Sequence, residues 1–468
     1  MHWITSRLFL YGSTVLSLVL ISVVVFCPAT ADALSLEQAR RAALEANLDI
    51  KIAAEKLIET ESLSKERYSA LFFRVDAIGD LTHMNKERKV DIGRGEYGTY
   101  GATGPLPSSN ISIAAGERDT YEARLRLTQP VFTGGRLYYS YRSAQATKSA
   151  SRWDRQMSQE DILFKTERAY ISVLQAQELN KFAEDHKRNI KAHLHDMELK
   201  YKQGRAALNE LLKVKVEMAR AKEEVIKAKN ELLSTRGELN TILNRPYEQA
   251  IEVSLVGAPA ELELSLKDAE ARALLNRPDI KSMRALKKGA LFDRRVAQSG
   301  YYPDFKVVAE YTRQTDEPVV EPENWSAMLY MEYPLWQWGK IRHKVNAASA
   351  VERQNQYRIA SLRRQVSADV RQAWFKVREA DERIDVTEEG LEQARENLRI
   401  TKYGFEHGAR TSAALLDAEA VLSRANFEHT KAKYYAHFTR AVLRYASGIM
   451  LGKAGEEPTE VLDQVSGR

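Results

Sequence analysis

The feature that most constrains this fold is an internal duplication, because the chain carries one pattern twice. The segment LSLEQARRAALEANLDIK, which begins at Leu34, returns as LSLKDAEARALLNRPDIK at Leu264, an offset of 230 residues. Further on, TQPVFTGGR at Thr128 returns as EYPLWQWGK at Glu332, an offset of 204 residues. The difference of 26 residues (230 − 204) is an insertion in the first copy, between about residues 82 and 121, where glycine, proline and serine predict an exposed loop. A repeat of this length indicates one structural unit used twice.

Both copies predict the same order of elements: two helices, a strand, a loop, a second strand and two further helices. Ser35 and Ser265 are placed to cap the first helix of each copy. A charged stretch without proline predicts a helix from about Arg136 to Tyr201, which at 1.5 Å per residue spans on the order of 100 Å. Gly204 and Gly408 are predicted to make the turns after the long helices. We therefore expect two long helical hairpins in each chain.

The N-terminus predicts export. An apolar run from Leu8 to Phe26 precedes PATADA, whose alanines give an A-x-A cleavage signal ending at Ala31 or Ala33. A membrane anchor is the alternative for this run, and the cleavage signal favours a signal peptide. Cys27 is the only cysteine, and the bulky residue before it argues against lipidation, so the mature chain has no disulfide. No later run approaches about 18 apolar residues, the length of a helix that crosses a bilayer.

The signal peptide and the two copies divide the chain into five segments. The first structural repeat covers 34–250 and the second covers 264–450, with a linker at 251–263 between them. The signal peptide covers 1–33, and a C-terminal tail covers 451–468. Each repeat is long enough to hold two strands and a pair of coiled helices.

Four segments alternate strictly between apolar and polar residues, two in each copy. Their apolar members are Phe73, Val75, Ala77, Gly79 and Leu81; Tyr121, Ala123, Leu125 and Leu127; Phe305, Val307, Ala309 and Tyr311; and Trp325, Ala327, Leu329, Met331 and Tyr333. Each segment has about ten residues, the length of a tilted strand that crosses a bilayer with lipid on one face and water on the other. Strands of a soluble sheet are the alternative. The signal peptide favours membrane strands, and so do the aromatic residues Phe132, Trp336 and Trp338, which suit a membrane interface.

Four strands do not close a barrel, and lipid does not tolerate open sheet edges. The smallest transmembrane barrels have about eight strands, so the chain must be completed by copies of itself. Two chains would give eight strands and little room for a pore, whereas three would give twelve. The sequence therefore predicts a homotrimer around a twelve-stranded β-barrel, with four strands from each chain.

The returning helix of the first copy carries a heptad seam. Its apolar residues recur every seven positions in two series, Leu211, Met218, Val225, Leu232 and Leu239, and Val214, Ala221, Ala228, Thr235 and Ile242. A neighbouring column adds Leu212, Ala219, Ile226 and Leu233. The second copy has a seam of smaller residues, from Leu415 to Ala446. A two-helix coiled coil would explain the seam alone, and the wider stripe favours a helix flanked by neighbours in a tube.

Composition and motifs argue against an enzyme, a nucleic-acid binder and a metal protein. The net charge is only +6 against 70 basic and 64 acidic residues, and lysine alternates with glutamate along the helices, as on a solvated face. His193 and His195 point to different faces of a helix, which argues against a metal site. There is no phosphate-binding loop, no G-x-G-x-x-G that follows a predicted strand and no G-x-S-x-G. We therefore expect no cofactor.

These residues resemble the outer-membrane efflux protein (TolC) family. The resemblance rests on the paired LSLEQARRAALEANLDI and LSLKDAEARALLNRPDI openings, the QPVFTGGR and YPLWQWGK junctions, and the turns YKQGRAALNELL and FEHGARTSAALLDAEA, and it covers almost the whole mature chain. It implies an α+β membrane protein, a trimer whose β-barrel continues into a long periplasmic α-helical barrel, with the linker in an equatorial ring. The barrel-to-helix junction would contain Pro130, Gly134, Gly135, Pro334 and Gly339.

The resemblance also implies a function. The chain would be an outer-membrane channel subunit of a tripartite efflux or type I secretion system, a passive conduit from periplasm to exterior. Its partners would be a periplasmic adaptor, an inner-membrane pump and outer-membrane lipid. A periplasmic coiled-coil adaptor or scaffold protein is the alternative, with the strands in a soluble domain, and a self-sufficient porin is a second one.

In this family, polar links between neighbouring coils and an inward acidic ring close the periplasmic end of the tunnel. By motif match, Arg410 is at a linking position and Asp417 is at an acidic-ring position. Asn209 and Glu210 match the polar pair on the partner turn. Phe405 stands where a tyrosine can occur, so one hydroxyl link is expected to be missing. The alternative is that Arg410, Glu210 and Asp417 are ordinary exposed helix charges.

Overall fold

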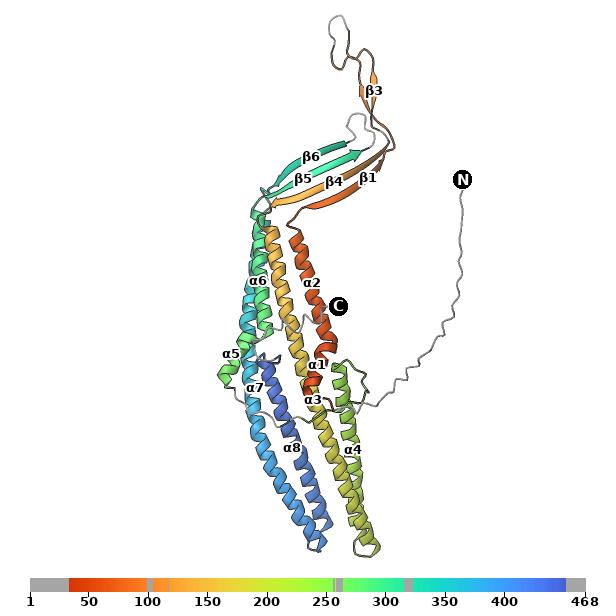
Figure 1. Ribbon diagram of the computed structural model, residues 1–468, viewed down its shortest axis with the longest axis vertical. Coiled ribbons are helices and arrows are strands. Elements are labelled where there is room, and N and C mark those ends of the chain that lie inside the picture. Colours follow the sequence, from red (N-terminus) through yellow and green to blue (C-terminus); the bar gives the residue numbers. More distant parts are fainter. Residues whose placement is uncertain are drawn as a thin grey trace, which may run out of the picture.

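The computed structural model describes residues 33–98, 104–116, 118–255, 257, 264–314 and 323–451. Within them, helices form an elongated bundle, and a sheet lies at one end of it (Figure 1). The elements in chain order are α1 (Leu36–Ala46), α2 (Leu48–Ser69), β1 (Arg74–His83), β2 (Arg88–Ile92), β3 (Ile111–Gly116), β4 (Asp119–Phe132), α3 (Arg136–Lys202), α4 (Leu208–Ile242), α5 (Leu266–Asn276), α6 (Pro278–Gln298), the short 3₁₀ helix η2 (Ser299–Tyr301), β5 (Asp304–Gln314), β6 (Glu323–Glu332), α7 (Lys340–Glu406) and α8 (Ser412–Ala446). The expected signal peptide up to residue 32, the end of the linker and the tail from residue 452 lie outside the described residues.

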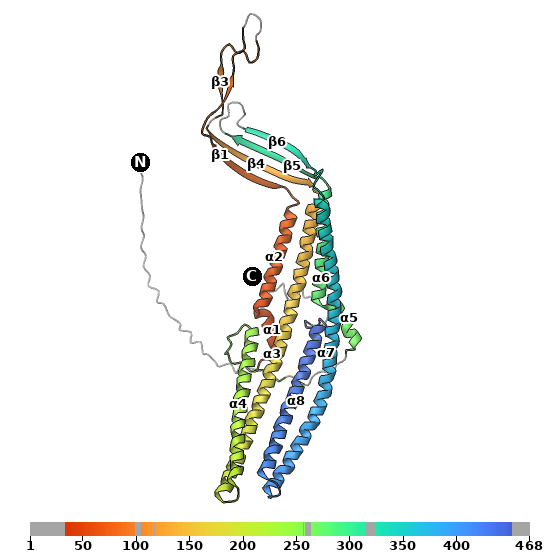
Figure 2. The same ribbon diagram turned by 180° about the vertical axis from the view of Figure 1, so that it is seen from behind.

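The two halves of the chain contain helices of matching length. α3 and α7 have 67 residues each, and α4 and α8 have 35 each. α1 and α5 have 11 residues each, and α2 and α6 have 22 and 21. At 1.5 Å per residue, α3 and α7 are each about 100 Å long, so both run almost the whole length of the bundle (Figure 2). The predicted long helices are therefore confirmed.

Side-chain caps determine where the first helices of each half begin. The Ser35 hydroxyl accepts a hydrogen bond from the Gln38 amide at 3.2 Å, and the Gln38 side chain accepts one from the Ser35 amide at 2.8 Å. This reciprocal pair is a capping box. Asn47 caps α2, and the Ser265 hydroxyl caps α5 by accepting from the Asp268 amide at 3.2 Å. The predicted caps at Ser35 and Ser265 are confirmed.

Each half is tied at its beginning to the middle of its own long helix. The Tyr170 hydroxyl of α3 is fully buried and lies 2.8 Å from the carbonyl oxygen of Leu34. The Trp374 indole of α7 donates a hydrogen bond to the carbonyl oxygen of Leu264 at 3.1 Å. Tyr170 and Trp374 are 204 residues apart, the same offset that relates the two strand-to-helix junctions. The chain therefore uses one anchoring contact twice.

The four long strands form one antiparallel sheet in the order β1-β4-β5-β6. Val75 lies opposite Leu127, and Leu81 lies opposite Tyr121, so apolar residues of neighbouring strands share one face. The residues between them, most of them polar, share the other face. β1 and β6 are the two edges, and no further described strand pairs with either. The four predicted strands are confirmed, but their alternation is strict only in β4, because the other face also carries Ile78 of β1, Val308 of β5, and Met328 and Tyr330 of β6.

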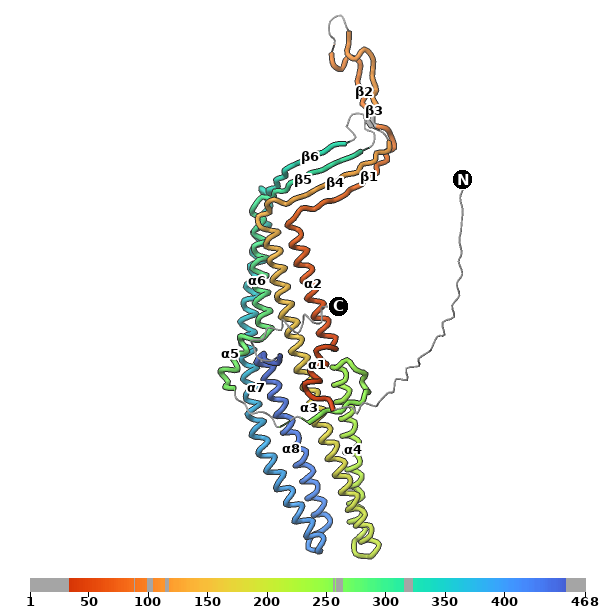
Figure 3. The backbone as a smooth tube through the Cα atoms, in the orientation of Figure 1, coloured from red at the N-terminus to blue at the C-terminus, as the bar shows by residue number. Residues whose placement is uncertain are grey.

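The insertion in the first half is not the plain loop that its glycine and proline content predicted. β2 and β3 pair as an antiparallel hairpin that extends beyond the sheet (Figure 3). Val90 and Ile92 on β2, and Ile111 and Ile113 on β3, supply the β-branched residues that suit paired strands. The prediction was wrong because the glycines and prolines lie mainly between these two runs, and the runs themselves alternate.

The heptad seam of α4 is the face that packs on α3. Its buried members are Leu211, Val214, Met218, Ala221, Val225, Thr235 and Leu239. The neighbouring column is left open, with Leu212 51%, Ile226 61% and Leu233 54% exposed. The predicted seam is confirmed, and a second apolar stripe has no partner among the described residues of this chain.

We expect Val225→Asp to destabilise the α3–α4 hairpin by about 3 kcal/mol, because it places a charge without a partner in a buried seam. Lys229→Asp changes an exposed residue of the same helix and is the matched control. Chemical unfolding followed by circular dichroism at 222 nm, a wavelength that reports helix, measures both. Equal stability of the two variants would mean that the seam is not a packed face.

Candidate functional site at the helical tips and strand-to-helix junctions

The two long helical hairpins end in turns at the end of the bundle farthest from the sheet (Figure 1). Gly204 follows α3 with φ +67°, and Gly408 follows α7 with φ +74°. These left-handed values favour glycine, which has no Cβ to clash. In the first turn the Arg205 amide donates to the Lys200 carbonyl oxygen at 2.8 Å, and the Ala409 amide makes the equivalent bond in the second at 2.7 Å. We call these two turns and the adjoining helix ends the helical tips.

Phe405, near the end of α7, joins the second hairpin to the first. Its ring meets the His193 ring of α3 edge to face, with 5.3 Å between centroids, and the Lys200 ammonium lies 3.9 Å from its centroid. The buried His193 Nε2 also lies 3.0 Å from the Ser412 hydroxyl oxygen of α8. Burial lowers the pKa of His193, so its ring is neutral at pH 7. Phe405 has no hydroxyl to donate, as expected from the sequence. It instead joins the two hairpins through an aromatic contact with His193.

Arg410 and Glu210 lie at the tips but do not meet within one chain. Arg410 is exposed, and its stem passes close to Gly404, where an added Cβ would come 2.7 Å from the Arg410 Cγ atom. Glu210 lies in the first turn of α4 and is half-buried. Among the described residues, no ion pair joins Arg410 to Glu210 or to Asp417.

A groove of about 520 Å³ separates α4 from α8 near the tips. Its lining residues are Asn209, Leu212, Lys213, Val216, Glu217, Arg220, Ala413, Leu416 and Asp417. Two of the predicted gate residues, Asn209 and Asp417, share this groove from opposite helices. Arg410, Glu210 and Phe405 lie outside its described lining.

Glu419 is a half-buried glutamate between the two hairpins that was not predicted from the sequence. Burial raises its pKa to about 7, Lys402 opposes the shift, and Glu217 of α4 adds to it. Its Oε2 atom is buried and accepts no hydrogen bond from the described residues. The signal that could have identified it is its place directly after Ala418, a buried seam residue.

Farther from the tips, α3 and α8 hold the two hairpins together through buried contacts. The Phe164 and Tyr445 rings stack with 4.8 Å between centroids. The Tyr445 hydroxyl donates to the Asp161 carboxylate, and Arg444 pairs with the buried Glu167. These contacts were not predicted from the sequence, because they depend on which helices become neighbours.

The predicted junction glycines lie where strands pass into the long helices. Gly134 and Gly135 have φ +59° and +83°, and Gly339 has φ +76°. A Cβ on Gly134 would come 2.7 Å from the carbonyl oxygen of Ser299 in η2. The first junction therefore requires glycine both for its backbone conformation and for close packing.

The predicted junction prolines lie at the same end of the sheet. Pro130 is near the end of β4, where the pairing with β5 shifts register between Pro130 and Phe132. Pro334 comes two residues after the end of β6. Proline has no backbone N–H, so it suits an irregular position or a strand end better than a regular ladder.

The polar face of the sheet carries a network of opposite charges. Arg124 of β4 pairs with Asp80 of β1, and Arg126 of β4 pairs with Glu310 of β5 at 2.8 Å. Arg124 also lies 3.9 Å from Glu310. Three neighbouring strands are therefore linked by ion pairs on the face opposite the apolar one.

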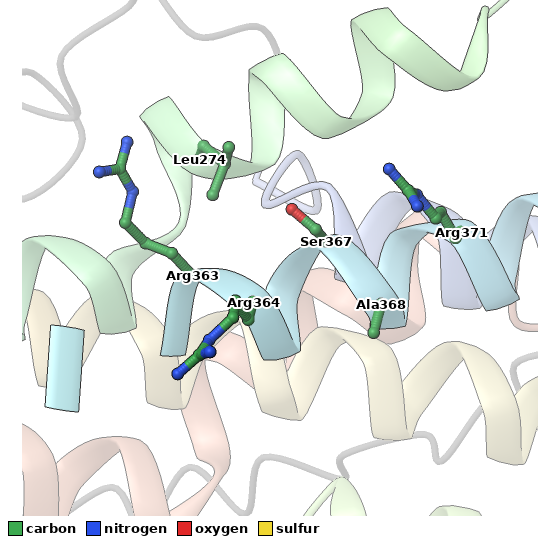
Figure 4. Close-up of a pocket in the computed structure, with 6 residues that line it drawn as sticks. All are labelled: Leu274, Arg363, Arg364, Ser367, Ala368 and Arg371. Carbon is green, nitrogen blue, oxygen red and sulfur yellow. The ribbon is translucent and has the colours of Figure 1, made fainter. Parts of the chain in front are cut away.

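A second cavity, of about 430 Å³, lies between α5 and α7. It is lined by Leu274, Arg363, Arg364, Ser367, Ala368 and Arg371. Arg363 and Arg371 extend on the side of α7 that faces Leu274, whereas Arg364 points the other way (Figure 4). Arg371 is already paired with Glu270 at 2.5 Å. Because the arginines do not converge on one point, we assign no ligand to this cavity.

No group of His, Cys, Asp and Glu side chains in the described part of the chain is arranged to hold a metal ion. Likewise, none of the described helices is both long and apolar enough to cross a membrane.

A comparison with protein families and curated proteins identifies relatives of this chain. The family model for the outer membrane efflux protein matches residues 40–245 and 271–448. The pyoverdine export outer membrane protein OpmQ of Pseudomonas aeruginosa is 22% identical over 324 residues, which are 66% of this chain. The match spans 65% of the length of that curated relative.

Solved structures with the same fold have low sequence identity to this chain. The CmeC outer membrane channel of Campylobacter jejuni superposes with a TM-score of 0.78 at 16% identity, covering 92% of this chain and 88% of CmeC. The open state of the MtrE outer membrane channel of Neisseria gonorrhoeae gives 0.72 at 17%, covering 90% and 91%. The outer membrane protein VceC of Vibrio cholerae gives 0.72 at 15%, covering 88% and 96%.

Stability should fall as pH rises because of two buried carboxyls, Glu419 of α8 and Glu160 of α3. Burial raises the pKa of each to about 7 from an ordinary 4.5. The folded chain then holds these protons more tightly than the unfolded chain does. The stability that each group contributes is therefore fully present below pH 4.5 and is lost as pH rises to about 7.

Glu419→Gln keeps an uncharged side chain at every pH. Between pH 5 and pH 8, its free energy of unfolding should therefore rise by about 2 kcal/mol relative to that of the native chain. Glu160→Gln should behave alike, and Glu392→Gln, at an exposed position on α7, is the control. Denaturant titrations across that range measure the difference. Parallel curves for Glu419→Gln and the native chain would contradict the burial of this carboxyl.

Proposed function

The chain belongs to the outer membrane efflux protein family and lies in the outer membrane, and from this premise we propose that it is one subunit of a homotrimeric export channel. The channel is a passive conduit from the periplasm to the exterior. A twelve-stranded β-barrel crosses the membrane, and a long α-helical barrel extends into the periplasm. The chain catalyses no reaction and needs no cofactor.

The observation that carries this proposal is the four-stranded sheet with two open edges and one exposed apolar face. Leu81, Leu125, Trp325 and Leu329 on that face are each more than half exposed. Exposing such an apolar face to water is unfavourable, whereas in a membrane lipid would cover it. Lipid in turn requires that every strand edge be paired, so β6 of one chain must pair with β1 of the next. Three chains of four strands close a barrel of twelve.

The helices support the same assembly. The stripe formed by Leu212, Ile226 and Leu233 on α4 is exposed in one chain and lies beside the seam that packs on α3. A helix with two adjacent apolar columns suits a tube wall, where it has a neighbour on each side. We infer that the two halves of the chain are a duplicated unit, so three chains supply six similar hairpins to that wall.

The partners follow from what a passive conduit requires. The sequence has no phosphate-binding loop, and its G-x-G-x-x-G at Gly93–Gly98 follows β2 but is followed by no described helix before β3. A pump in the inner membrane would therefore supply the energy, and a periplasmic adaptor would join the pump to the helical tips. Both a tripartite efflux system and a type I secretion system have this arrangement. The likeness to a pyoverdine export protein favours a small exported molecule as cargo. A periplasmic adaptor or scaffold, the alternative, would leave the apolar face of the sheet in water.

Purified in mild detergent, the native chain should have three times the subunit mass by light scattering and should lose that mass on heating. Leu329→Lys places a charge at the middle of the lipid-facing side of β6 and should cost about 2–4 kcal/mol, lowering the yield of trimer in outer-membrane fractions. Ser326→Lys, on the opposite face of the same strand, is the matched control and should assemble normally. A stable monomer that keeps its β signal would contradict the proposal.

The helical tips are the proposed gate. We place the Arg410–Glu210 link between adjacent chains, where a charge-assisted bond would contribute about 1–3 kcal/mol to a narrow mouth. Three copies of Asp417, about two helical turns beyond Arg410, would form a negative constriction that favours cations. Asn209 shares the groove of Asp417, and the Phe405 contact holds the second hairpin against the first.

In planar bilayers, Arg410→Ser should raise the single-channel conductance without loss of the trimer, because it removes the link. Asp417→Ala should instead weaken cation selectivity or block by cations. Arg395→Ser, an exposed change farther along α7, is the control and should leave conductance unchanged. If Arg410→Ser and Asp417→Ala both behave as this control does, these residues are ordinary solvated charges.

A further inference from the structure

Glu419 lies on the face of α8 that packs against the first hairpin. It follows Leu416 by three residues, so the two side chains share one face of the helix. Leu416 packs against Met218 and Ala221 of α4, and it lines the groove between α4 and α8. Glu419 is therefore placed between the two hairpins, about one helical turn from the groove lining.

The carboxyl of Glu419 is poorly matched to this place. Its Oε2 atom is buried and accepts no hydrogen bond from the described residues. The counterpart in the first half, 204 residues earlier, is Lys215, which is exposed. The backbone plan that the two halves share therefore does not require a buried acid at this position. A buried polar atom without a partner is costly, so it calls for a functional explanation.

The charged neighbours of Glu419 lie on different hairpins, and α8 lies between α7 and α4 (Figures 1 and 2). Lys402 of α7 belongs to the same hairpin as Glu419 and favours its ionised form. Glu217 of α4 belongs to the other hairpin and opposes ionisation. Glu217 also lines the groove and pairs with Arg220 of its own helix at 3.3 Å. The two hairpins thus act on the Glu419 charge with opposite sign.

The other elements around Glu419 add no further charge to it. No charged group of α3 acts on Glu419 among the described residues. His193 of α3 contacts α8 at Ser412, about two turns from Glu419, and burial lowers the pKa of His193, so its ring is neutral above pH 6.5. On α8 itself, Asp417 lines the groove but lies two residues away, on a different face of the helix. Ionisation of Glu419 is therefore opposed by its burial and by Glu217.

We propose that Glu419 is a pH-sensitive switch that controls the separation of the two hairpins at the mouth, a proposal that rests on the gate of the proposed function. When Glu419 is protonated, it is neutral and α8 packs close to α4. When it is ionised, Lys402 attracts it within its own hairpin and Glu217 repels it from the other. Both forces move α8 away from α4, so the groove widens and the mouth opens.

The direction of the pH effect follows from burial. Burial raises the pKa of Glu419 to about 7 in the closed form, and water that enters as the hairpins separate would return it toward the ordinary 4.5. The closed form therefore holds the proton more tightly than the open form. The preference for the closed form is complete below pH 4.5 and is lost as pH rises to about 7. Within this range, each unit of pH should change the balance by up to about tenfold in each subunit.

Single-channel recording of the full-length trimer in planar bilayers, from about pH 5 to about pH 8, tests the switch. The native channel should spend about tenfold more time in its high-conductance state at the upper end of this range. Glu419→Gln keeps a neutral side chain and should remove this change. If Glu419→Gln responds to pH as strongly as the native channel does, the switch is wrong.

Two variants separate the switch from other effects of pH. Glu160→Gln removes a second carboxyl whose pKa burial raises to about 7, in the part of α3 farther from the tips, and it should keep the native response. Loss of the response in Glu160→Gln would mean that a general fall in stability opens the mouth, and it would overturn the proposal. Glu217→Gln removes the repelling carboxylate, so the response should shift to lower pH. An unshifted response would overturn the proposed opposition between Glu217 and Glu419.

Spin labels give a readout that needs no conducting channel. Lys222→Cys on α4 and Ala420→Cys on α8 are exposed positions that accept the labels. Pulsed electron paramagnetic resonance of the trimer in detergent then measures the separation of the two helices. This separation should increase with pH in the native background and stay constant with Glu419→Gln. A constant separation in the native background would overturn the switch, whereas a trimer that conducts at no pH would contradict the proposed channel instead.

Discussion

Two hydrogen bonds at the middle of the molecule determine the position of the other elements. Tyr170 and Trp374 hold the residues that begin the two halves, Leu34 and Leu264, against the centres of α3 and α7. A long helix that packs through a heptad seam can slide by seven residues and regain similar contacts. A buried hydrogen bond to one carbonyl removes that ambiguity. The lengths of α1–α2 and α5–α6 then bring β1 and β5 to the level at which α3 and α7 begin (Figure 1).

From this centre the coupling between the two hairpins weakens toward the tips. Near the middle, stacked rings and an ion pair to the buried Glu167 join α3 to α8, as in the Phe164–Tyr445 and Arg444–Glu167 contacts. Near the tips, a groove lies between α4 and α8, with the buried carboxyl of Glu419 close by. Regions with fewer buried apolar contacts open at a lower free energy. The proposed gate therefore lies where separating the two hairpins costs least.

The sequence predicted the elements well because their signals are local. Alternation identified the four strands, Ser35 and Ser265 marked helix starts, and charged runs without proline marked the long helices. What it did not predict depends on neighbours distant in the chain. The α3–α8 contacts and the burial of Glu419 arise only when two hairpins meet, and a heptad pattern does not say which helices those are. The β2–β3 hairpin was missed for a local reason, since glycine and proline at its centre obscured two short alternating runs.

The differences between the two halves are more informative than their likeness. Where both must build a strand, a turn or an anchor, equivalent residues do the same task, as Tyr170 and Trp374 do. The halves diverge where their surroundings differ. The first has a hairpin beyond the sheet and glycine at a packed junction, and the second has a strained tryptophan at an open one. Because both halves share one backbone plan, such a departure reflects the environment of that junction and not the needs of the fold.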